Sequence, residues 1–275
     1  MKGVAGLCVA IVFMVTQVSF AQPAKDSKQE VILKSGAEIG FEVSHIKYEE
    51  PDFMEEEGIM YGLSGSYAVH QNKSMLKLDG RLTWGQVDYT SPESGDLNDI
   101  NDYIFETRFS LGYDYSFSTT TIMTPYIGIG YRYLNDDTSG MVSSTGTMGY
   151  ERESNYLYSP IGIDITSRIQ NGWIIGATAE YDLFWYGLQR THLEDIAVGL
   201  NALDNDQHEG WGVRGSVKIE KKSGNIDFVI EPFIRYWDIK KSDESVITYY
   251  NFIIGEGYEP ANNSTEWGIK LALKF

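Results

Sequence analysis

YIFETRFSLGYDY, residues 103–115, alternates apolar and polar side chains with a period of two. Successive side chains of a β-strand point to opposite faces, so this segment has one apolar face and one polar face. Tyrosines lie near both ends of the apolar face, with Phe and Leu between them. Aromatic residues flanking an apolar band are typical of the lipid-facing side of a transmembrane β-barrel strand.

The same alternation recurs along the chain. It predicts an all-β fold, in which residues 37–275 form a single antiparallel up-and-down transmembrane barrel. The pattern indicates about ten strands and is compatible with 8 to 12. The expected strands are 37–48, 59–69, 75–89, 102–115, 121–134, 155–166, 173–185, 210–220, 226–239 and 264–275. Twelve strands would result if 135–154 or 240–263 formed a further hairpin.

The connections between these segments alternate in length. Short ones are expected near 70–74, 116–120, 167–172 and 221–225, and long ones at 49–58, 90–101, 135–154, 186–209 and 240–263. Short periplasmic turns and long extracellular loops are a property of outer-membrane barrels. Both ends of the barrel sequence then lie in the periplasm, which requires an even number of strands.

The N-terminus has the pattern of a secretory signal peptide. In MKGVAGLCVAIVFMVTQVSFA, residues 1–21, Lys2 precedes an apolar run, and small residues stand at the −3 and −1 positions of a cleavage site after Ala21. An N-terminal membrane anchor is the alternative, but the apolar run is short for a span. Residues 22–36 are expected to form a polar periplasmic lead-in, and Cys8, within the signal, is the only cysteine of the sequence.

The last segment, TEWGIKLALKF (265–275), alternates and ends on an aromatic residue. It resembles the C-terminal insertion signal of bacterial outer-membrane proteins, carried here by Trp267, Ile269, Leu271, Leu273 and Phe275. TPYIGIGYRYL (124–134) is similar to strands of small opacity-type, porin-like barrels. The resemblance implies a Gram-negative outer-membrane location and insertion by the barrel-assembly machinery, but it is not specific for any activity.

If the apolar faces point to lipid, the inward side chains are polar and nearly balanced in charge. The candidate pore-lining residues are Arg81, Arg108, Arg132, Arg214, Arg235, Glu106, Glu180 and Glu231. Unpaired buried charges are costly, so balanced charges favour paired networks that fill a narrow lumen. Inward glycines, which include Gly130, Gly176 and Gly212, either relieve crowding or leave a thin water path, and both alternatives remain open.

Acidic residues exceed basic ones by 39 to 22, a formal net charge of −17, which argues against nucleic acid as a partner. The expected partners are outer-membrane lipid and lipopolysaccharide. The first long loop could bind divalent cations through its acids, Glu49, Glu50, Asp52, Glu55, Glu56 and Glu57, although it matches no defined calcium loop. No metal site and no cofactor are expected. The apolar stretch 245–260 is expected either to pack against other loops or to form a contact surface for a partner.

Two acidic loop segments resemble parts of omptin proteases, which have ten strands with paired aspartates facing an Asp-x-His pair across an extracellular cleft. Asp206 and His208 match the Asp-x-His spacing, and Asp99 with Asp96 or Asp102 would supply the opposing carboxylates. These acids are spaced by three rather than two, and the Trp-flanked omptin motif is missing. We therefore expect no catalytic residues and no enzymatic activity.

Three functions follow in order of preference. The first is an integral outer-membrane barrel with a structural or surface-interaction role. The second is a narrow, porin-like diffusion pore whose selectivity the inward arginines would set. The third is an omptin-like protease.

Overall fold

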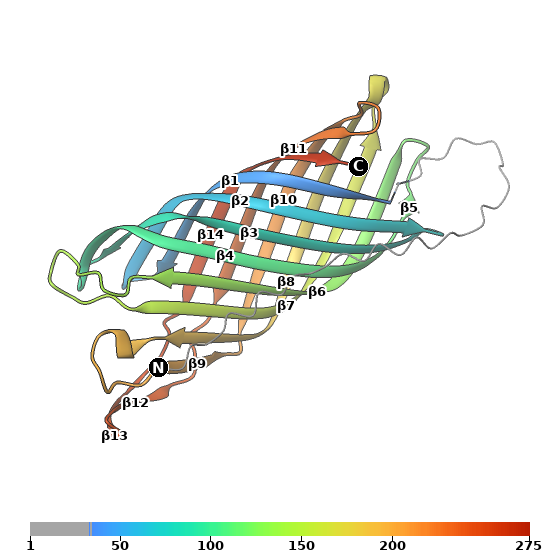
Figure 1. Cartoon of the computed structure of the whole chain (residues 1–275). Helices are drawn as coiled ribbons and strands as arrows, with labels where there is room; N and C mark the ends of the chain where they lie inside the picture. The colour runs from blue at the N-terminus through green and yellow to red at the C-terminus, as the bar shows by residue number, and fades with distance from the viewer. Residues whose placement is uncertain (1–32, 34) are drawn as a thin grey trace, which may run out of the picture.

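The computed structural model describes residue 33 and residues 35–275 (Figure 1). A closed barrel of 10 antiparallel strands, each paired with its neighbours along the chain, confirms the predicted all-β up-and-down fold. Its wall consists of β1 (Gly36–Glu50), β2 (Met54–Gln71), β3 (Ser74–Ser91), β4 (Gly95–Tyr113), β6 (Thr121–Asp137), β7 (Glu151–Arg168), β8 (Trp173–Thr191), β10 (Gly210–Lys221), β11 (Asp227–Ile239) and β14 (Asn262–Lys274). Pairing of β1 with β14 closes the sheet.

The barrel begins one residue before its predicted start, at Gly36. The predicted signal peptide, 1–21, and most of the predicted lead-in, 22–36, lie outside the described residues. Among the residues that the structure describes, no helix is long and apolar enough to cross a membrane.

Several short elements lie at the two ends of the barrel, in addition to the strands of its wall. They are β5 (Tyr115–Ser116), η1 (Gln170–Gly172), η2 (Leu193–Asp195), β9 (Leu203–Gln207), β12 (Ser245–Tyr249) and β13 (Phe252–Gly257). The segment 240–263 does contain a hairpin, β12–β13, but this hairpin is a separate two-stranded sheet and the wall keeps ten strands. Figure 1 shows it at the lower left, at the end of the barrel that carries the long connections.

The extracellular strand ends were predicted too short. The predicted loop 49–58 is reduced to a turn at 51–53, and the predicted loop 90–101 to a turn at 92–94, because Glu49 pairs with Glu55 and Glu55 with Thr90. Above the membrane the outer face meets water and becomes polar. The contrast between the two faces is lost there while backbone pairing continues, so the sequence pattern resembles a loop.

The outer face carries the predicted apolar belt. Register aligns Tyr61, Trp84 and Tyr103 across β2, β3 and β4, and two residues further along these strands it aligns Leu63, Leu82 and Phe105. The outward residues of the C-terminal signal are exposed as well, with Trp267 at 58% and Leu271 at 53%. This belt is the surface that faces hydrocarbon, and the aromatic row marks its extracellular border.

The interior is layered along the barrel axis. Charged side chains occupy the membrane level, and two apolar clusters lie nearer the extracellular end. One cluster contains Ile46, Met60, Val87, Leu97, Ile100 and Ile104, and the other Tyr156, Tyr158, Phe184, Trp237 and Ile239. These apolar residues lie on the strand faces for which the sequence pattern predicts polar, inward side chains, so the sequence did not predict an apolar interior there.

Candidate functional site

Most of the predicted lumen residues meet in one ion-pair network at the membrane level. Arg81 is its centre: Nε donates to Glu106 Oε2 at 2.8 Å, and Nη1 and Nη2 donate to the two Glu266 carboxylate oxygens at 2.9 and 3.0 Å. The Arg81 side chain is 7% exposed and those of its two carboxylate partners 3%. A bidentate pair at such burial has good geometry and satisfies most of the charge.

Arg214 and Arg235 extend this network across the lumen. Arg214 Nη1 donates to Glu106 at 2.9 Å, and Arg214 Nε donates to Asp182 at 2.6 Å. Arg235 reaches Glu266 at 3.1 Å, so β3, β4, β8, β10, β11 and β14 are joined through their side chains. This layer, with Arg81, Glu106, Arg214, Arg235 and Glu266 as its members, is called the ion-pair layer below.

The remaining predicted lumen charges also point inward. Towards the periplasmic side, Arg108 Nη1 contacts Glu180 Oε1 at 2.8 Å, and Lys270 contacts Glu231 at 2.6 Å. A cavity of about 180 Å³ lies among these side chains. It lies on the periplasmic side of the ion-pair layer, and Arg214 and Arg235 of that layer contribute to its lining.

Arg132 differs from the other inward arginines. It is 1% exposed and, among the described residues, makes no ion pair; its guanidinium carbon lies 5.4 Å from the Trp237 ring centre. The tyrosine and tryptophan rings beside it fill the lumen against glycines. A Cβ at Gly130 would lie 2.3 Å from Tyr158 Cζ, and one at Gly212 would lie 2.9 Å from the Trp237 ring. These inward glycines make room for rings.

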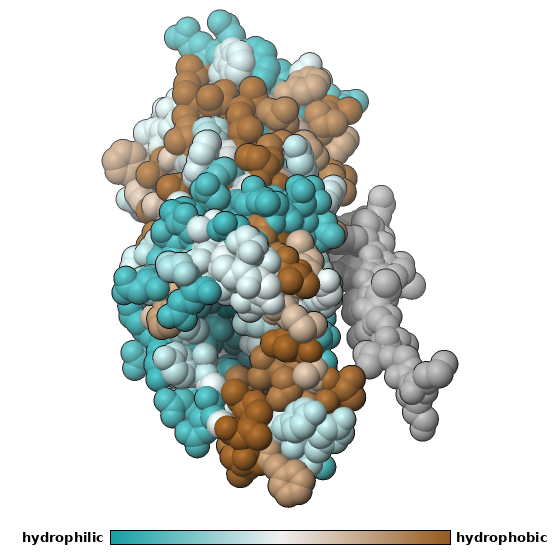
Figure 2. Space-filling view, turned by 90° about the vertical axis from the view of Figure 1, so that its left-hand side faces the viewer, coloured by the Kyte–Doolittle hydropathy of each residue, from teal (hydrophilic) through white to brown (hydrophobic). Residues whose placement is uncertain are grey.

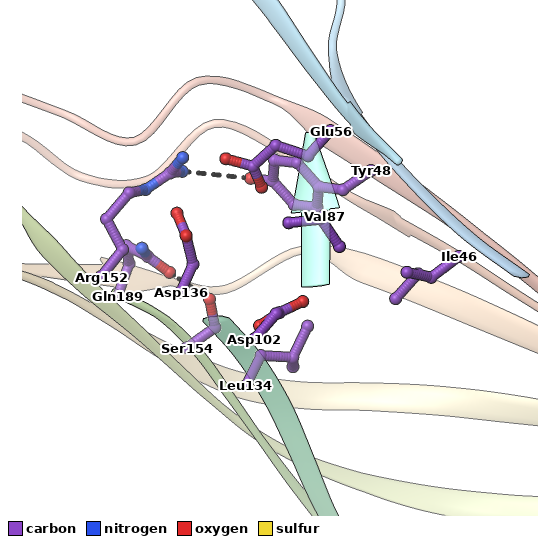
Figure 3. A pocket seen from close by; sticks show the side chains of 10 residues that line it. All are labelled: Ile46, Tyr48, Glu56, Val87, Asp102, Leu134, Asp136, Arg152, Ser154 and Gln189. Carbon is purple, nitrogen blue, oxygen red and sulfur yellow. Dashed lines mark hydrogen bonds between the residues drawn. The ribbon is translucent and has the colours of Figure 1, made fainter. Parts of the chain in front are cut away.

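Above the aromatic rings the barrel opens into an extracellular cavity of about 560 Å³, which we call the mouth. Figure 2 looks onto this end and shows the hollow surrounded by mostly hydrophilic surface. The lining combines carboxyl groups, among them Glu50, Glu56 and Glu259, with apolar side chains such as Leu97 and Ile247. A smaller pocket of about 30 Å³ adjoins it and shares Glu56, Asp136 and Arg152 as lining residues (Figure 3).

One arginine neutralises part of the mouth. Arg152 Nη2 lies 2.5 Å from Glu50 Oε1 and 2.6 Å from Glu259 Oε1, and it donates to the Tyr48 hydroxyl at 3.3 Å. Burial raises the pKa of Glu259 to about 7, against the attraction of Arg152 and reinforced by the neighbouring Glu50. The mouth therefore holds more carboxyl groups than its one arginine neutralises.

The residues of the protease hypothesis do not come together in the mouth. Asp206 is exposed on the outer side of β9, where it accepts a hydrogen bond from Tyr186, and the exposed His208 pairs with Asp243 at 3.2 Å. Asp96 and Asp99 are exposed too, and only Asp102 faces the interior pocket. The inward residues of β9 are instead Leu203, Asn205 and Gln207.

The acidic stretch 49–57 is not a loop and does not gather into one site. Glu50 and Glu56 are buried in the interior, whereas Glu49 and Glu55 lie outside and share Lys47 at 2.8 and 3.0 Å. Glu57 is also outside, beside His45. In the part of the chain that the structure describes, no group of three or more His, Cys, Asp or Glu side chains has the geometry to hold a metal ion.

An apolar patch lies on the β12–β13 hairpin. The side chains of Phe252 and Ile253 are 77% and 74% exposed, and Val198 in a neighbouring loop is 81% exposed. Its turn packs against the segment after β8, since Tyr250 N donates to Gly199 O at 2.8 Å. Figure 2 shows hydrophobic surface at the lower edge, where Figure 1 places this hairpin. The sequence left packing and a contact surface as alternatives; the backbone of the turn packs against the neighbouring loop, and the side chains of Phe252 and Ile253 remain exposed.

The mouth was the site that sequence reasoning missed. Asp136 and Arg152 fell in a predicted loop, 135–154, although they are paired in neighbouring strands, β6 and β7. A strand in this region could have been recognised only from polar residues that alternate between the two faces. Because neither face is apolar, the sequence does not show which residues point inward.

Comparison with known proteins agrees with this architecture. The family model for the outer membrane protein beta-barrel domain matches residues 10–186. No curated protein matches the sequence. Among solved structures, the outer membrane protease OmpT from Escherichia coli is 8% identical with a TM-score of 0.61, and the alignment covers 89% of this chain and 98% of OmpT.

Two further solved barrels are less similar. The toluene transporter TodX of Pseudomonas putida is 10% identical with a TM-score of 0.36, covering 89% of this chain and 90% of TodX. The attachment invasion locus protein Ail of Yersinia pestis is 8% identical with a TM-score of 0.32, and the alignment covers 88% of this chain and 100% of Ail. At such identities the likeness concerns the fold. The family match spans more than half of the sequence and agrees with the closed barrel, so the chain belongs to the outer-membrane β-barrel proteins and is located in the outer membrane.

Proposed function

We propose that this protein is a closed, non-enzymatic barrel that presents interaction surfaces outside the outer membrane. The ion-pair layer carries this proposal, because it crosses the lumen beneath an open mouth. A solute would have to break several buried ion pairs to pass, and separating such a pair in a low-dielectric interior costs about 3–5 kcal/mol. The mouth and the exposed apolar side chains of the β12–β13 hairpin are then the surfaces available to partners.

The expected life cycle follows from the two ends of the chain. Cleavage after Ala21 would release the mature protein into the periplasm. The barrel-assembly machinery would then recognise the alternating segment that ends at Phe275. In the membrane, the apolar belt contacts lipid, and outward acids such as Glu55 and Glu57 are placed to bind lipopolysaccharide phosphates through divalent cations.

A bilayer recording tests the closed lumen. The refolded mature protein, shown to be folded by its heat-dependent gel shift, is added to a planar bilayer. The expected result is the absence of discrete conductance steps. Reproducible steps that change in selectivity with Arg108→Ala would contradict the proposal and favour the narrow diffusion pore, for which the cavity of about 180 Å³ below the ion-pair layer is the supporting observation.

A further inference from the structure

Three carboxyl groups meet at the floor of the mouth and make no ion pair with Arg152, which lines the same pocket. Glu56 comes from β2, Asp102 from β4 and Asp136 from β6, and register places Asp102 directly opposite Asp136. Among the described residues, none of the three makes an ion pair, because the ion pairs of Arg152 go to Glu50 and Glu259. Figure 3 shows all three around one pocket.

Two of these groups have buried oxygen atoms with unmet hydrogen-bonding capacity. Glu56 is only 7% exposed, and its Oε1 has no hydrogen-bond partner; the same holds for Asp136 Oδ1. A buried carboxyl oxygen that lacks a partner costs free energy, so a donor from a ligand would stabilise this arrangement. Both atoms belong to residues that line the small pocket.

The size of the pocket limits what can occupy it. Its volume of about 30 Å³ is enough for a group the size of a water molecule. Its apolar walls, Ile46, Val87 and Leu134, lower the local polarity and strengthen any charge interaction there. The larger cavity beside it leaves room for the remainder of a ligand.

The chemistry of the site favours an ammonium group over a metal ion. Calcium takes about 6–8 oxygen ligands at close range, and no grouping of acids in the described part of the chain has metal-binding geometry. A primary ammonium group is compact and has three N–H donors. Three carboxyl groups around a water-sized pocket offer one acceptor to each N–H donor, and one ionised carboxylate balances the single positive charge.

We propose that the mouth binds a primary ammonium group between Glu56, Asp102 and Asp136, with the alkyl chain of the ligand along the apolar lining of the larger cavity. Two sources carry this chemistry, free polyamines and the lysine side chains of peptides. The proposal names the ligand class of the mouth and rests on the proposed surface-interaction function. Leu97, Leu203 and Ile247 line the larger cavity and would contact the methylene groups.

Calorimetric titration of the refolded full-length mature protein in detergent tests this site. Spermidine and the peptide acetyl-Gly-Lys-Gly-amide are the probes, and the trimethyl-lysine form of that peptide lacks the N–H donors. We expect saturable binding of spermidine or of the lysine peptide, and no binding of the trimethylated form. Spermidine alone would identify a polyamine site, and the peptide alone or both probes would identify a lysine-reading site.

Matched variants assign the binding to the pocket. Glu56→Gln and Asp102→Asn each remove one charge with little change of shape, and we expect a loss of affinity of about tenfold or more. Glu57→Gln is the control, because Glu57 is adjacent in sequence but exposed on the outer face. Its expected affinity is unchanged.

Several results would overturn the ammonium site. They are absence of binding of both probes to the folded wild-type barrel, unchanged affinity in both pocket variants, or an equal loss in Glu57→Gln. A barrel that is silent in the bilayer and binds neither probe would refute this inference alone. A conducting barrel that binds spermidine through Glu56 would instead refute the closed lumen.

Discussion

The ion-pair layer and the mouth are both lined by charged side chains inside the same barrel, yet their charges are arranged in opposite ways. In the layer, each of three arginines contacts at least two carboxylates, and the side chains are almost completely buried. In the mouth, a single arginine faces Glu50, Glu56, Asp136 and Glu259. Paired charges hold strands together, whereas unpaired ones leave binding capacity for a ligand.

The largest expected effect comes from breaking the ion-pair layer. Arg81→Ala would remove the cation that contacts Glu42, Glu106 and Glu266 together. Of the described residues, it would leave only Arg214 and Arg235 to neutralise these buried carboxylates. We expect a loss of about 3–5 kcal/mol in the free energy of unfolding, measured by urea titration in lipid vesicles.

An exposed pair provides the control for this variant. Arg190 and Asp204 form an ion pair at 2.6 Å in which both side chains are over 40% exposed. Arg190→Ala should cost about 1 kcal/mol or less. Equal losses in the two variants would show that burial and connectivity do not distinguish the ion-pair layer.

A smaller effect is expected from adding a methyl group against a lumen ring. Gly130→Ala places a Cβ where Tyr158 already lies, at 2.3 Å, so the ring must move. The expected cost is about 1–3 kcal/mol, read from the same urea titration. Gly176→Ala, whose Cβ would lie at an ordinary contact distance of 3.4 Å, should be tolerated. If Gly130→Ala were as stable as Gly176→Ala, the rings would not be filling the lumen.

The mouth should loosen as the pH rises. The folded-state pKa of Glu259, about 7, is above its usual value of 4.5, so its protonated form stabilises the folded mouth. This contribution is complete below about pH 4.5 and is lost as the pH rises through about 7. Limited proteolysis of the loops should therefore be faster at about pH 8 than at about pH 5, after correction for protease activity.

Glu259→Gln tests the assignment of this pH effect. The neutral amide cannot ionise, so the difference in loop proteolysis between the two pH values should decrease. An undiminished difference would assign the effect to another group.

The smallest effect is expected at the outer-face Asp-x-His pair. Asp206→Asn and His208→Ala alter exposed side chains that contact only neighbouring surface groups, so stability should change by less than about 0.5 kcal/mol. Neither variant should change the rate of fluorescence increase that the protein produces with a quenched fluorogenic peptide. Peptide cleavage by the wild type that either substitution abolishes would restore the protease hypothesis.

The limits of sequence prediction are clearest at the strand ends. Within the membrane, lipid on one side and a polar lumen on the other impose the contrast seen in 103–115. Above the membrane, Glu55, Glu56 and Glu57 alternate outside and inside with no change in polarity. The period of two persists there, but it has no apolar face by which to recognise it.

The sequence by itself determined a barrel of about ten strands, the inward or outward direction of the membrane-level side chains, and the lipid-facing belt, because Cβ direction alternates strictly along a strand. Only the tertiary structure decided which inward charges meet. Arg81 and Glu266 are 185 positions apart, and their contact depends on strand register and closure. Register between neighbouring strands brings Glu56, Asp102 and Asp136 to one pocket without an ion-pair partner among the described residues, which no local pattern indicates.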